Sequence, residues 1–231
     1  MDFPFKYETH VHCTPASYCG LSSPEEVVAC YAEAGYAGLF LTDHFFNGNC
    51  GIARNLPWAE RVRQFADGFH RAKRAGDAVG FNVFFGYEFA NAGAEFLVLN
   101  STEQFLYDHP DLLEWELEEF LQRVREAGAF VVHAHPCREA FYIPDPRRRY
   151  PGLVDAVEVF NASHNPNFNP PAAAYAEACG LPPFSGSDNH DPYHIQGAGI
   201  AFQRNPASAA ELLGRVKARD YALLPPGCAR A

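Results

Sequence analysis

Apolar, strand-like runs alternate with amphipathic helical segments along most of this chain of 231 residues. The segments typical of helices cover residues 22–35, 57–76, 110–128, 170–180 and a stretch that begins with the capping pattern from Ser208 to Glu211. The strand-like runs cover residues 5–11, 36–44, 81–90, 94–100, 129–136, 155–161, 183–190, 197–203 and 221–226. This order predicts an α/β protein with a mostly parallel sheet covered by helices, formed by one domain over residues 1–231.

Charge and composition restrict the partners of the chain. The net charge is -10 at pH 7, whereas a nucleic-acid duplex requires a basic surface, so we expect no such partner. No run is long enough to span a membrane, and the first ten residues, "MDFPFKYETH", lack the apolar region of a signal peptide. The seven cysteines are odd in number and contain no CxxC pair, which predicts reduced thiols and a cytoplasmic location. These features do not predict the oligomeric state.

Side chains of the types that bind metals follow the predicted strands at their C-terminal ends. His10 and His12 stand two residues apart in "ETHVH", so an extended backbone would point both rings to one face. The other such side chains at predicted strand ends are Asp43, His44, Glu88, His133, His135, Asp188 and His190. The C-terminal ends of parallel strands meet at one edge, which is the functional face of α/β sheets and barrels.

Each of these motifs alone has an ordinary explanation. A lone HxH can be a solvated strand, "TDH" a helix cap, and "HAHP" a turn before proline. Together, however, that explanation leaves many polar side chains clustered without partners, which is costly for partly buried groups. A shared metal cluster removes this cost, because neutral imidazole is a common metal ligand. The sequence therefore predicts a metal site at the strand ends.

The ordered motifs "HVH", "TDH", "GYE", "HAHP", "EVFN" and "GSDNH" give the chain a resemblance to a known family. Over roughly residues 7–200, the chain resembles the PHP (polymerase and histidinol phosphatase) domain family. The resemblance implies a distorted (β/α)7 barrel with the metal site at the C-terminal ends of its strands. It also implies a centre of two or three divalent metal ions, trinuclear when complete, and the hydrolysis of phosphoesters.

The resemblance assigns the metal ligands residue by residue. It implies a first ion bound by four side chains, His10, His12, Glu88 and Asp188. It implies a second ion bound by the bridging Glu88 and by His135. It implies a third ion bound by His44 and His190. Asp43 and His133 are expected to orient these ligands without binding metal themselves.

The chain departs from the family pattern at two places. Glu95 stands where many members have a histidine, and its oxygen ligand shifts preference toward harder ions, so zinc, manganese and iron are all candidates. In "CTPASYCG", where several members supply a further histidine to the third ion, the chain has Ser17, Tyr18 and Cys19. The third site is then weak, or a thiolate or phenolate replaces the histidine. For Cys13 and Cys19 we favour simple packing as small buried residues.

The resemblance and the predicted strand ends also indicate substrate and catalytic roles. Arg138 can hold a phosphate with its bidentate fork, and Asn161 is expected to line the pocket. Glu88 and Asp188 are expected to be catalytic, with a hydroxide that bridges the metals on Glu88 attacking phosphorus in line. His164 or a metal-bound water is the candidate for protonating the alcohol that leaves.

Three functions remain open at this point. The first is a phosphoesterase that acts on a small phosphorylated metabolite or nucleotide. The second is an amidohydrolase-type metal hydrolase that cleaves a C–N or lactone bond, because such enzymes also place an HxH on the first strand of a barrel. Amidohydrolases usually bridge their metals with a modified lysine or a glutamate, and no lysine stands at a central predicted strand end here. The third is a metal-binding domain that has lost catalysis.

Overall fold

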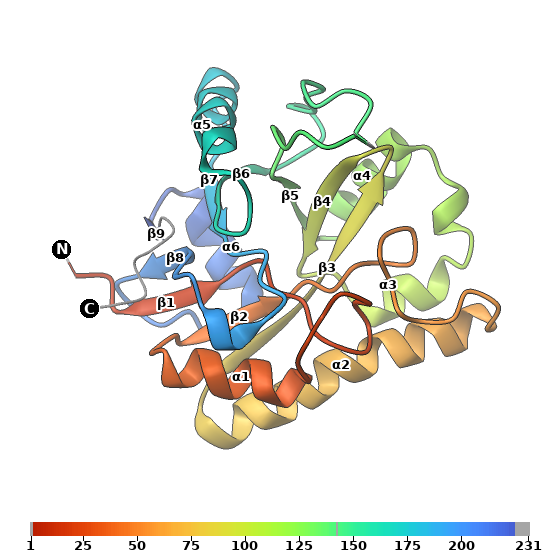
Figure 1. Cartoon of the computed structure of the whole chain (residues 1–231), viewed down its shortest axis with the longest axis horizontal. Helices are drawn as coiled ribbons and strands as arrows, with labels where there is room; N and C mark the ends of the chain where they lie inside the picture. The colour runs from red at the N-terminus through yellow and green to blue at the C-terminus, as the bar shows by residue number, and fades with distance from the viewer. Residues whose placement is uncertain (1, 142, 225–231) are drawn as a thin grey trace.

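The computed structural model describes residues 2–141 and 143–224, which form a mixed α/β fold around one sheet (Figure 1). Its strands are β1 (Phe5–Glu8), β2 (Gly38–Leu41), β3 (Asn82–Asn91), β4 (Ala94–Leu99), β5 (Phe130–Ala134), β6 (Ala156–Asn161), β7 (Pro183–Gly186), β8 (Gly199–Phe202) and β9 (Ala222–Leu224). Its α-helices are α1 (Pro24–Glu33), α2 (Trp58–Val79), α3 (Glu103–Asp108), α4 (Leu117–Glu126), α5 (Asn169–Ala178) and α6 (Ala209–Lys217). Short 3-10 helices are η1 (Leu112–Glu114), η2 (Pro166–Phe168) and η3 (Pro192–His194). Cys228 and the end of the predicted strand 221–226 lie outside the described residues.

The sheet is mixed rather than mostly parallel, which corrects the prediction. Its order is β7-β6-β5-β4-β3-β2-β1-β8-β9, and four of the eight pairings are antiparallel: β3 with β4, β4 with β5, β1 with β8, and β8 with β9. The tight turn between β3 and β4 explains part of this, because Ala92 (φ 48°) and Gly93 (φ 86°) adopt the positive φ values of a hairpin turn. A hairpin necessarily joins antiparallel strands.

The edge strand β7 approaches β8 and β9 at the other edge of the sheet, so the sheet forms a nearly closed barrel. Ser185 on β7 donates its hydroxyl to the carbonyl of Leu224 on β9 at 2.5 Å and accepts from the backbone of Gly199 on β8 at 3.2 Å. Nine strands occur in the described residues, so the count of seven strand–helix units that the family resemblance implied is not confirmed. The α/β barrel itself, with helices outside, is present (Figure 1).

The helix ends follow local capping chemistry, although α2 continues through Gly76, where the sequence predicted its end, to Val79. Ser23 caps α1 in a capping box with Glu26, and Gly80 ends α2 in the left-handed conformation at φ 72°. The segment predicted over 110–128 is broken, because Trp115 and Glu116 are extended between η1 and α4. None of the helices in the described ranges is both long and apolar enough to cross a bilayer.

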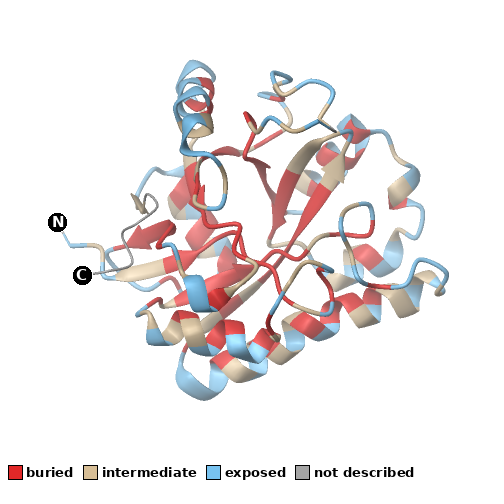
Figure 2. Ribbon diagram, viewed as in Figure 1, coloured by how far each residue is buried: buried red, intermediate tan, exposed pale blue. Residues whose placement is uncertain are grey.

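The core lies inside the barrel and between the sheet and the outer helices. Figure 2 shows the strands mostly buried, while the helices turn exposed faces outward. Phe40, Leu97, Phe184 and Phe202 are fully buried and belong to one apolar cluster that joins several strands. Burial of each such side chain contributes about 1.5–3 kcal/mol. This packing fixes the strand ends that carry the polar site.

Candidate metal centre

The C-terminal ends of five strands bring the candidate ligands together. These residues follow β1, β2, β5 and β7 or lie within β3, and they are His10, His12, His44, Glu88, His135, Asp188 and His190. Isolated parallel bridges join His44 to Glu88 and Val11 to Asn189, which extends the strand pairing past the formal strand ends. The alternation of strands and helices therefore delivers the polar side chains to one rim, as the sequence predicts.

The first strand is shorter than the predicted run over residues 5–11. Strand β1 ends at Glu8, and the HxH pair lies in the segment just after it. The two rings still converge, with the centroids of His10 and His12 5.1 Å apart. Convergence is therefore preserved, although these two residues are not in a regular strand.

All eight predicted metal ligands take part in compact groups of potential ligand atoms. Among the residues that the structure describes, four groups of three side chains place one ligand atom each within 4.8 Å of the others. The groups are His12, His44 and His190; His10, His135 and Asp188; His10, His12 and Glu88; and His44, Glu88 and Glu95. Because the groups share members, they form one continuous cluster. It offers enough ligand atoms for more than one ion.

Buried polar atoms without partners indicate that a cation suits this cluster. The Nε2 atoms of His10 and His12 are buried without a hydrogen-bond partner. His10 directs its Nε2 toward Oε1 of Glu88 at 3.3 Å and Oδ1 of Asp188 at 3.5 Å. Facing acceptors repel one another unless a proton or a cation lies between them. The donor set of imidazoles and carboxylates suits a divalent ion, so the residues fit the metal that the sequence predicts.

Glu158 fixes the orientation of the His10 ring, and this role was not predicted from the sequence. Its Oε1 accepts a hydrogen bond from Nδ1 of His10 at 2.9 Å, while its Oε2 accepts from the backbone of His135 at 2.9 Å. Since an ionised carboxylate only accepts, Nδ1 of His10 carries the hydrogen and Nε2 keeps the lone pair. The available signal was an acid inside the apolar run "DAVEVFN", where a buried charge requires a partner.

Glu8 holds the backbone beneath the site and was also missed. It is fully buried, and its Oε1 accepts from the backbone of Thr9 and His10 at 2.8 and 3.0 Å. Its Oε2 accepts from the hydroxyls of Ser187 at 2.6 Å and Tyr31 at 3.1 Å. Burial raises the pKa of Glu8 despite these bonds. The carboxyl group thus joins the segments that carry the first and last ligand motifs.

Asp43 orients the ring of His12 through Ser17. The hydroxyl of Ser17 donates to Oδ1 of Asp43 at 2.6 Å and lies 3.2 Å from Nδ1 of His12. A hydroxyl has one hydrogen, so Ser17 accepts from His12 and leaves the lone pair of that ring on Nε2. Asp43 therefore orients a predicted ligand, as expected, with Ser17 as the intermediate that the sequence did not reveal.

The pKa values of the imidazoles follow from burial and from the neighbouring carboxylates. Burial acts to lower the pKa of His10, but the negative charges around it, first that of Asp188, raise it well above the usual value. Burial also opposes protonation of His44, while the charge of Glu88 raises its pKa to about 11. Burial and the proximity of His44 lower the pKa of His12 to about 3. The potential in the cluster is strongly negative, which favours cations.

Glu95 and Arg138 form an ion pair at the rim of the cluster. Nη2 of Arg138 donates to Oε2 of Glu95, and the same oxygen lies 3.5 Å from Nε2 of His135. Burial raises the pKa of Glu95, and the nearby charge of Glu88 adds to this effect. Glu95 therefore stands where it can reach a metal, while Arg138, the predicted phosphate ligand, is held in place by a carboxylate.

The residues predicted to contact substrate occupy different depths. Asn161 is buried, and its Nδ2 donates to Oε2 of Glu158 at 3.0 Å, so it supports the site from below rather than lining an open pocket. His164 lies at the rim, with Nε2 2.9 Å from Oδ2 of Asp188 and 3.5 Å from Nη1 of Arg138. Burial lowers the pKa of His164, which works against its predicted role as a proton donor.

His133 does not orient a ligand, contrary to the prediction. Its ring stacks on Phe96 at 5.1 Å and meets Tyr150 and Tyr175 edge-on, with Nδ1 buried and without a hydrogen-bond partner. Burial lowers its pKa to about 3. The reason is geometric: the backbone turns at His135, where φ is 27°, so the two rings do not follow the alternation of a regular strand.

The two cysteines near the site differ from each other. Cys13 is buried, as predicted, and its thiol donates to Oδ2 of Asp43 at 3.2 Å. Cys19 is only partly buried, so the prediction of simple packing is wrong for it. Burial raises the pKa of its thiol, but hydrogen bonds to His190 and His44 outweigh this and lower the pKa to about 6.

The backbone around two predicted ligands is strained. His135 and Asp188 have φ values of 27° and 53°, in a region that residues other than glycine seldom adopt. Such conformations cost about 1–3 kcal/mol and persist where the surroundings impose them, often at functional sites. Gly186 allows the close approach beneath the cluster, because a Cβ atom there would lie 2.5 Å from Cβ of His10.

Comparison with known proteins supports this architecture. No protein-family model and no curated protein matches the sequence. Solved structures do match. A two-domain protein from Bacteroides vulgatus, which contains a predicted PHP-like metal-dependent phosphoesterase, superposes with a TM-score of 0.72 at 19% identity over 96% of this chain. This chain covers 65% of that protein.

Two further structures extend the comparison. A protein from Bifidobacterium adolescentis, whose name gives metal-dependent phosphoesterase as an inferred activity, has a TM-score of 0.53 at 16% identity, covering 83% of this chain and 90% of its own. An amidohydrolase from Chromobacterium violaceum has a TM-score of 0.59 at 16% identity, covering 98% of this chain and 100% of its own. At these identities the similarity shows the fold, an α/β barrel of the type found in PHP-like and amidohydrolase proteins.

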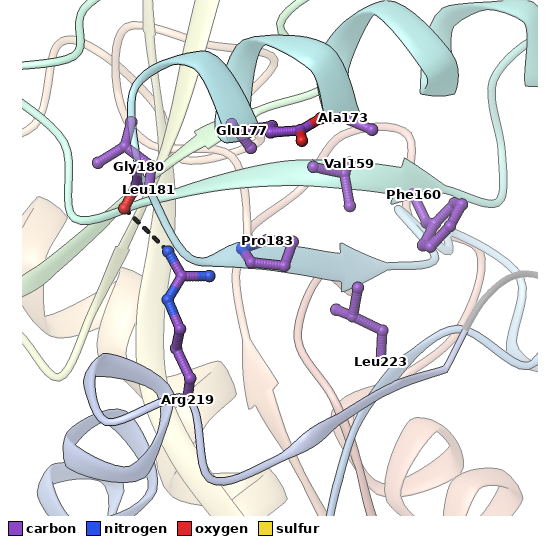
Figure 3. Close-up of a pocket in the computed structure, with 10 residues that line it drawn as sticks. Val159, Phe160, Ala173, Glu177, Gly180, Leu181, Pro183, Arg219 and Leu223 are labelled. Atoms are coloured by element: carbon purple, nitrogen blue, oxygen red, sulfur yellow. Dashed lines mark hydrogen bonds between the residues drawn. The ribbon is translucent and has the colours of Figure 1, made fainter.

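A separate cavity lies on the outside of the barrel, between α5 and strands β6, β7 and β9 (Figure 3). Its volume is 380 Å³, and its lining is mostly apolar, with Val159 and Leu223 on opposite sides. Arg219 donates to the carbonyl of Gly180 at its edge at 2.9 Å. Glu158, the neighbour of Val159 on β6, instead bonds His10 inside the barrel. The cavity therefore lies on the opposite face of β6 from the metal cluster.

Proposed function

We propose that this protein is a PHP-type, metal-dependent phosphoesterase that hydrolyses a small phosphorylated metabolite or nucleotide. It would hold two or three divalent ions, with zinc, manganese and iron as candidates. The observation that carries the proposal is a pair of buried imidazole nitrogens without hydrogen-bond partners, Nε2 of His10 and Nε2 of His12, which face carboxylate oxygens of Glu88 and Asp188. Two lone pairs that converge on carboxylates in a fully enclosed position are costly unless a cation binds them.

The residues of the chain have distinct tasks in such a site. Bound divalent ions would supply Lewis acidity, neutralise phosphoryl charge and lower the pKa of water. Glu88 lies between the histidines of both halves of the cluster, with contacts to His10 at 3.3 Å and His44 at 2.7 Å, so it suits a bridging role. Asp188 contacts His12 at 3.1 Å and His164 at 2.9 Å, so it links the cluster to the rim where substrate would enter.

Positive charge near the rim supports an anionic substrate. The loop after His135 carries Arg147 and Arg149, although the chain as a whole has a net charge of -10. Both arginines line a 630 Å³ cavity together with Cys137 and Asn165, which are within two residues of His135 and His164. Arg149 is held by the carbonyls of Pro136 and Pro146 and the thiol of Cys137. Guanidinium groups in this position can bind phosphate oxygens.

An amidohydrolase activity is the second candidate, because one of the similar folds belongs to an amidohydrolase. The chain contains three lysines, and each has a partner away from the cluster: the carbonyl of Ala34 for Lys6, Asp77 for Lys73 and Asp155 for Lys217. A modified lysine therefore cannot bridge the metals here. This observation favours the phosphoesterase over that class of site.

Metal content followed by a substrate panel tests the proposal. Protein purified without chelator should contain about two or three equivalents of zinc, manganese or iron. It should release phosphate from small phosphomonoesters or nucleotides, and Glu88→Gln should abolish release while Glu33→Gln, on the exposed end of α1, should not. Hydrolysis of amides or lactones without phosphate release would instead establish the second candidate. Failure to bind metal after reconstitution would overturn both.

A further inference from the structure

Strand β6 has a bulge where it separates the metal cluster from the outer cavity. Glu158 pairs with Phe184 of β7, and the next pair along the strand joins Phe160 to Ser185. Val159 is therefore an extra residue in β6, and such a bulge breaks the alternation of side chains along a strand. As a result, the consecutive side chains of Val159 and Phe160 both line the cavity outside the barrel (Figure 3).

The residues on either side of this pair face the metal cluster. Oε1 of Glu158 accepts from Nδ1 of His10 at 2.9 Å. Nδ2 of Asn161 lies 3.0 Å from Oε2 of Glu158 and 3.4 Å from Oδ2 of Asp188. The segment 158–161 thus forms a wall of the cavity on one face of β6 and supports the metal ligands on the other.

The cavity has the size and the lining of a small-molecule site. Its volume of 380 Å³ falls within the range of about 300–1,000 Å³ that is typical of such sites. The space exists because α5 presents two small side chains to it, those of Ala173 and Ala176. Pro183 and Leu223 add apolar surface from the strands opposite α5 (Figure 3). This lining favours an occupant with a large apolar group.

Two opposite charges at this cavity are not paired with each other. Arg219 and Glu177 both line it and are exposed, yet neither side chain has an ion pair in the part of the chain that the structure describes. Arg219 donates to the carbonyl of Gly180 at 2.9 Å. By contrast, the arginine one turn earlier, Arg215, forms an ion pair with Glu211. The cavity thus offers one positive and one negative group, which complement a zwitterion.

Arg219 occupies a backbone position where glycine is usual. It follows the end of α6 with a φ of 59°. Its backbone NH donates to the carbonyl of Val216 at 3.0 Å, and that of Asp220 donates to the carbonyl of Arg215 at 2.9 Å. These bonds define a Schellman motif, whose left-handed residue is usually glycine and sometimes asparagine. Strained residues often mark functional positions, so the conformation favours a role for this side chain at the cavity.

We propose that this cavity binds a small zwitterion with a large apolar side chain, of the chemical class of the aromatic amino acids. The carboxylate of the ligand pairs with Arg219 and its ammonium group with Glu177, while its ring packs between α5 and strands β6, β7 and β9. This site does not depend on the proposed function. Its second property does rest on that function: an occupied cavity tightens metal binding.

The bulge of β6 carries the effect of the ligand to the metal centre. A ring packed against Val159 and Phe160 restricts the movement of the bulge. This restriction holds Glu158 and Asn161 in the positions from which they support the metal ligands. Coupling between two sites typically changes affinity about 5–150-fold, and the effect is reciprocal. Metal should therefore tighten ligand binding by the same factor by which the ligand tightens metal binding.

Calorimetric titration with three probes tests the site without relying on catalysis. L-Tryptophan carries both charges, indole-3-propionate lacks the ammonium group, and tryptamine lacks the carboxylate. Tryptophan should bind about tenfold more tightly than either of the others, because each of them loses one charge-assisted hydrogen bond. In Glu177→Gln, tryptophan should lose its advantage over indole-3-propionate. Equal affinities of the wild type for the three probes, or no binding of tryptophan, would overturn the proposal.

Matched variants test the location of the site. Arg219→Asn removes the positive charge at a position that asparagine tolerates, and it should weaken tryptophan binding about tenfold. Arg204→Asn, at another exposed position, should bind like the wild type. Ala173→Phe fills the cavity from α5 and should abolish binding, whereas Ala174→Phe, an exposed neighbour that does not line the cavity, should not. Unchanged binding in both Arg219→Asn and Ala173→Phe would reject this cavity as the site.

Further outcomes separate this inference from the proposed function. Zinc-loaded protein should bind tryptophan about fivefold or more tightly than chelator-treated protein, and equal affinities would overturn the coupling. Tryptophan binding by a protein that neither binds metal nor releases phosphate would support the site and reject the proposed function. Sedimentation tests another occupant: a wild-type dimer that Ala173→Phe dissociates would show that a second copy of the chain fills the cavity, which would overturn the proposal.

Discussion

Oε1 of Glu158 lies 2.9 Å from Nδ1 of His10, and both side chains are fully buried inside the barrel. This contact sets the tautomer of the ring, because a carboxylate can only accept the hydrogen. The other carboxylate oxygen accepts from the backbone of His135 and from Nδ2 of Asn161. Glu158 thus orients the ring of His10, just after β1, and the backbone of His135, just after β5.

Replacing Glu158 by glutamine should weaken metal binding without creating a cavity in the core. In Glu158→Gln the side chain keeps its volume but has one acceptor oxygen, so the amide NH₂ must face either His10 or the donors of His135 and Asn161. We expect metal affinity to fall about 10–100-fold, the usual cost of losing such an orienting group. Competition with a chelator measures it, and Glu33→Gln on the exposed end of α1 is the control. Equal affinities would contradict the orienting role.

Acid should destabilise the protein through His133, independently of the ligands. Burial lowers the pKa of this ring from 6.5 to about 3. A histidine with a lowered folded-state pKa contributes stability above its unfolded-state pKa, and this contribution is lost as the pH falls toward the folded-state value. Between these two values the slope is about 1.4 kcal/mol per pH unit.

His133→Phe preserves stacking on Phe96 and removes this titration. Unfolding by denaturant, measured on chelator-treated protein from about pH 7 to pH 4, should show a shallower loss of stability in the variant than in the wild type. Parallel profiles for the wild type and His133→Phe would show that the ring does not titrate in this range.

A methyl group at Gly186 should disturb both the fold and the metal centre. Its Cβ would lie 2.5 Å from Cβ of His10 and 2.6 Å from Oε1 of Glu158. We expect Gly186→Ala to lose about 1–3 kcal/mol of unfolding free energy, as overpacked sites do, and to bind metal more weakly. Gly214→Ala in α6 meets open space and should gain about 0.5–1 kcal/mol. Thermal unfolding and metal titration of both variants check this, and a neutral Gly186→Ala would contradict the packing argument.

The set of ligands at the rim was predictable from sequence because it depends on the alternation of apolar strands and helices along the chain. Glu88, His135 and Asp188 come at or just after apolar runs, and parallel strands place such ends together. The antiparallel pairings of β4 and β8 were not predicted. The β3–β4 hairpin depends on the conformation of Ala92 and Gly93, and the pairing of β8 with β1 on a contact between distant segments.

Supporting residues were harder to predict than ligands. Glu158 looks like an isolated acid in a strand until β6 is placed beside β5 and His10 comes within reach. Ser17 carries no metal-binding signal, and its function depends on the fold of the loop that brings it between Asp43 and His12. Such contacts are set by tertiary structure, which a motif in one sequence does not encode.

Metal removal should lower the thermal stability of the protein, because the cluster binds ions only when it is folded. An ion present at 100 times its dissociation constant stabilises the native state by about 2.7 kcal/mol. For a chain of this length, this corresponds to about 5–10 °C in Tm for each bound ion. Thermal scans with zinc, manganese or excess chelator measure the difference.

Glu88→Gln, which loses the central carboxylate, should show little response to metal, whereas Glu33→Gln on the exposed end of α1 should respond like the wild type. An identical Tm with metal and with chelator in the wild type would mean that the buried lone pairs of His10 and His12 are not filled by cations, and the site would need another chemical role.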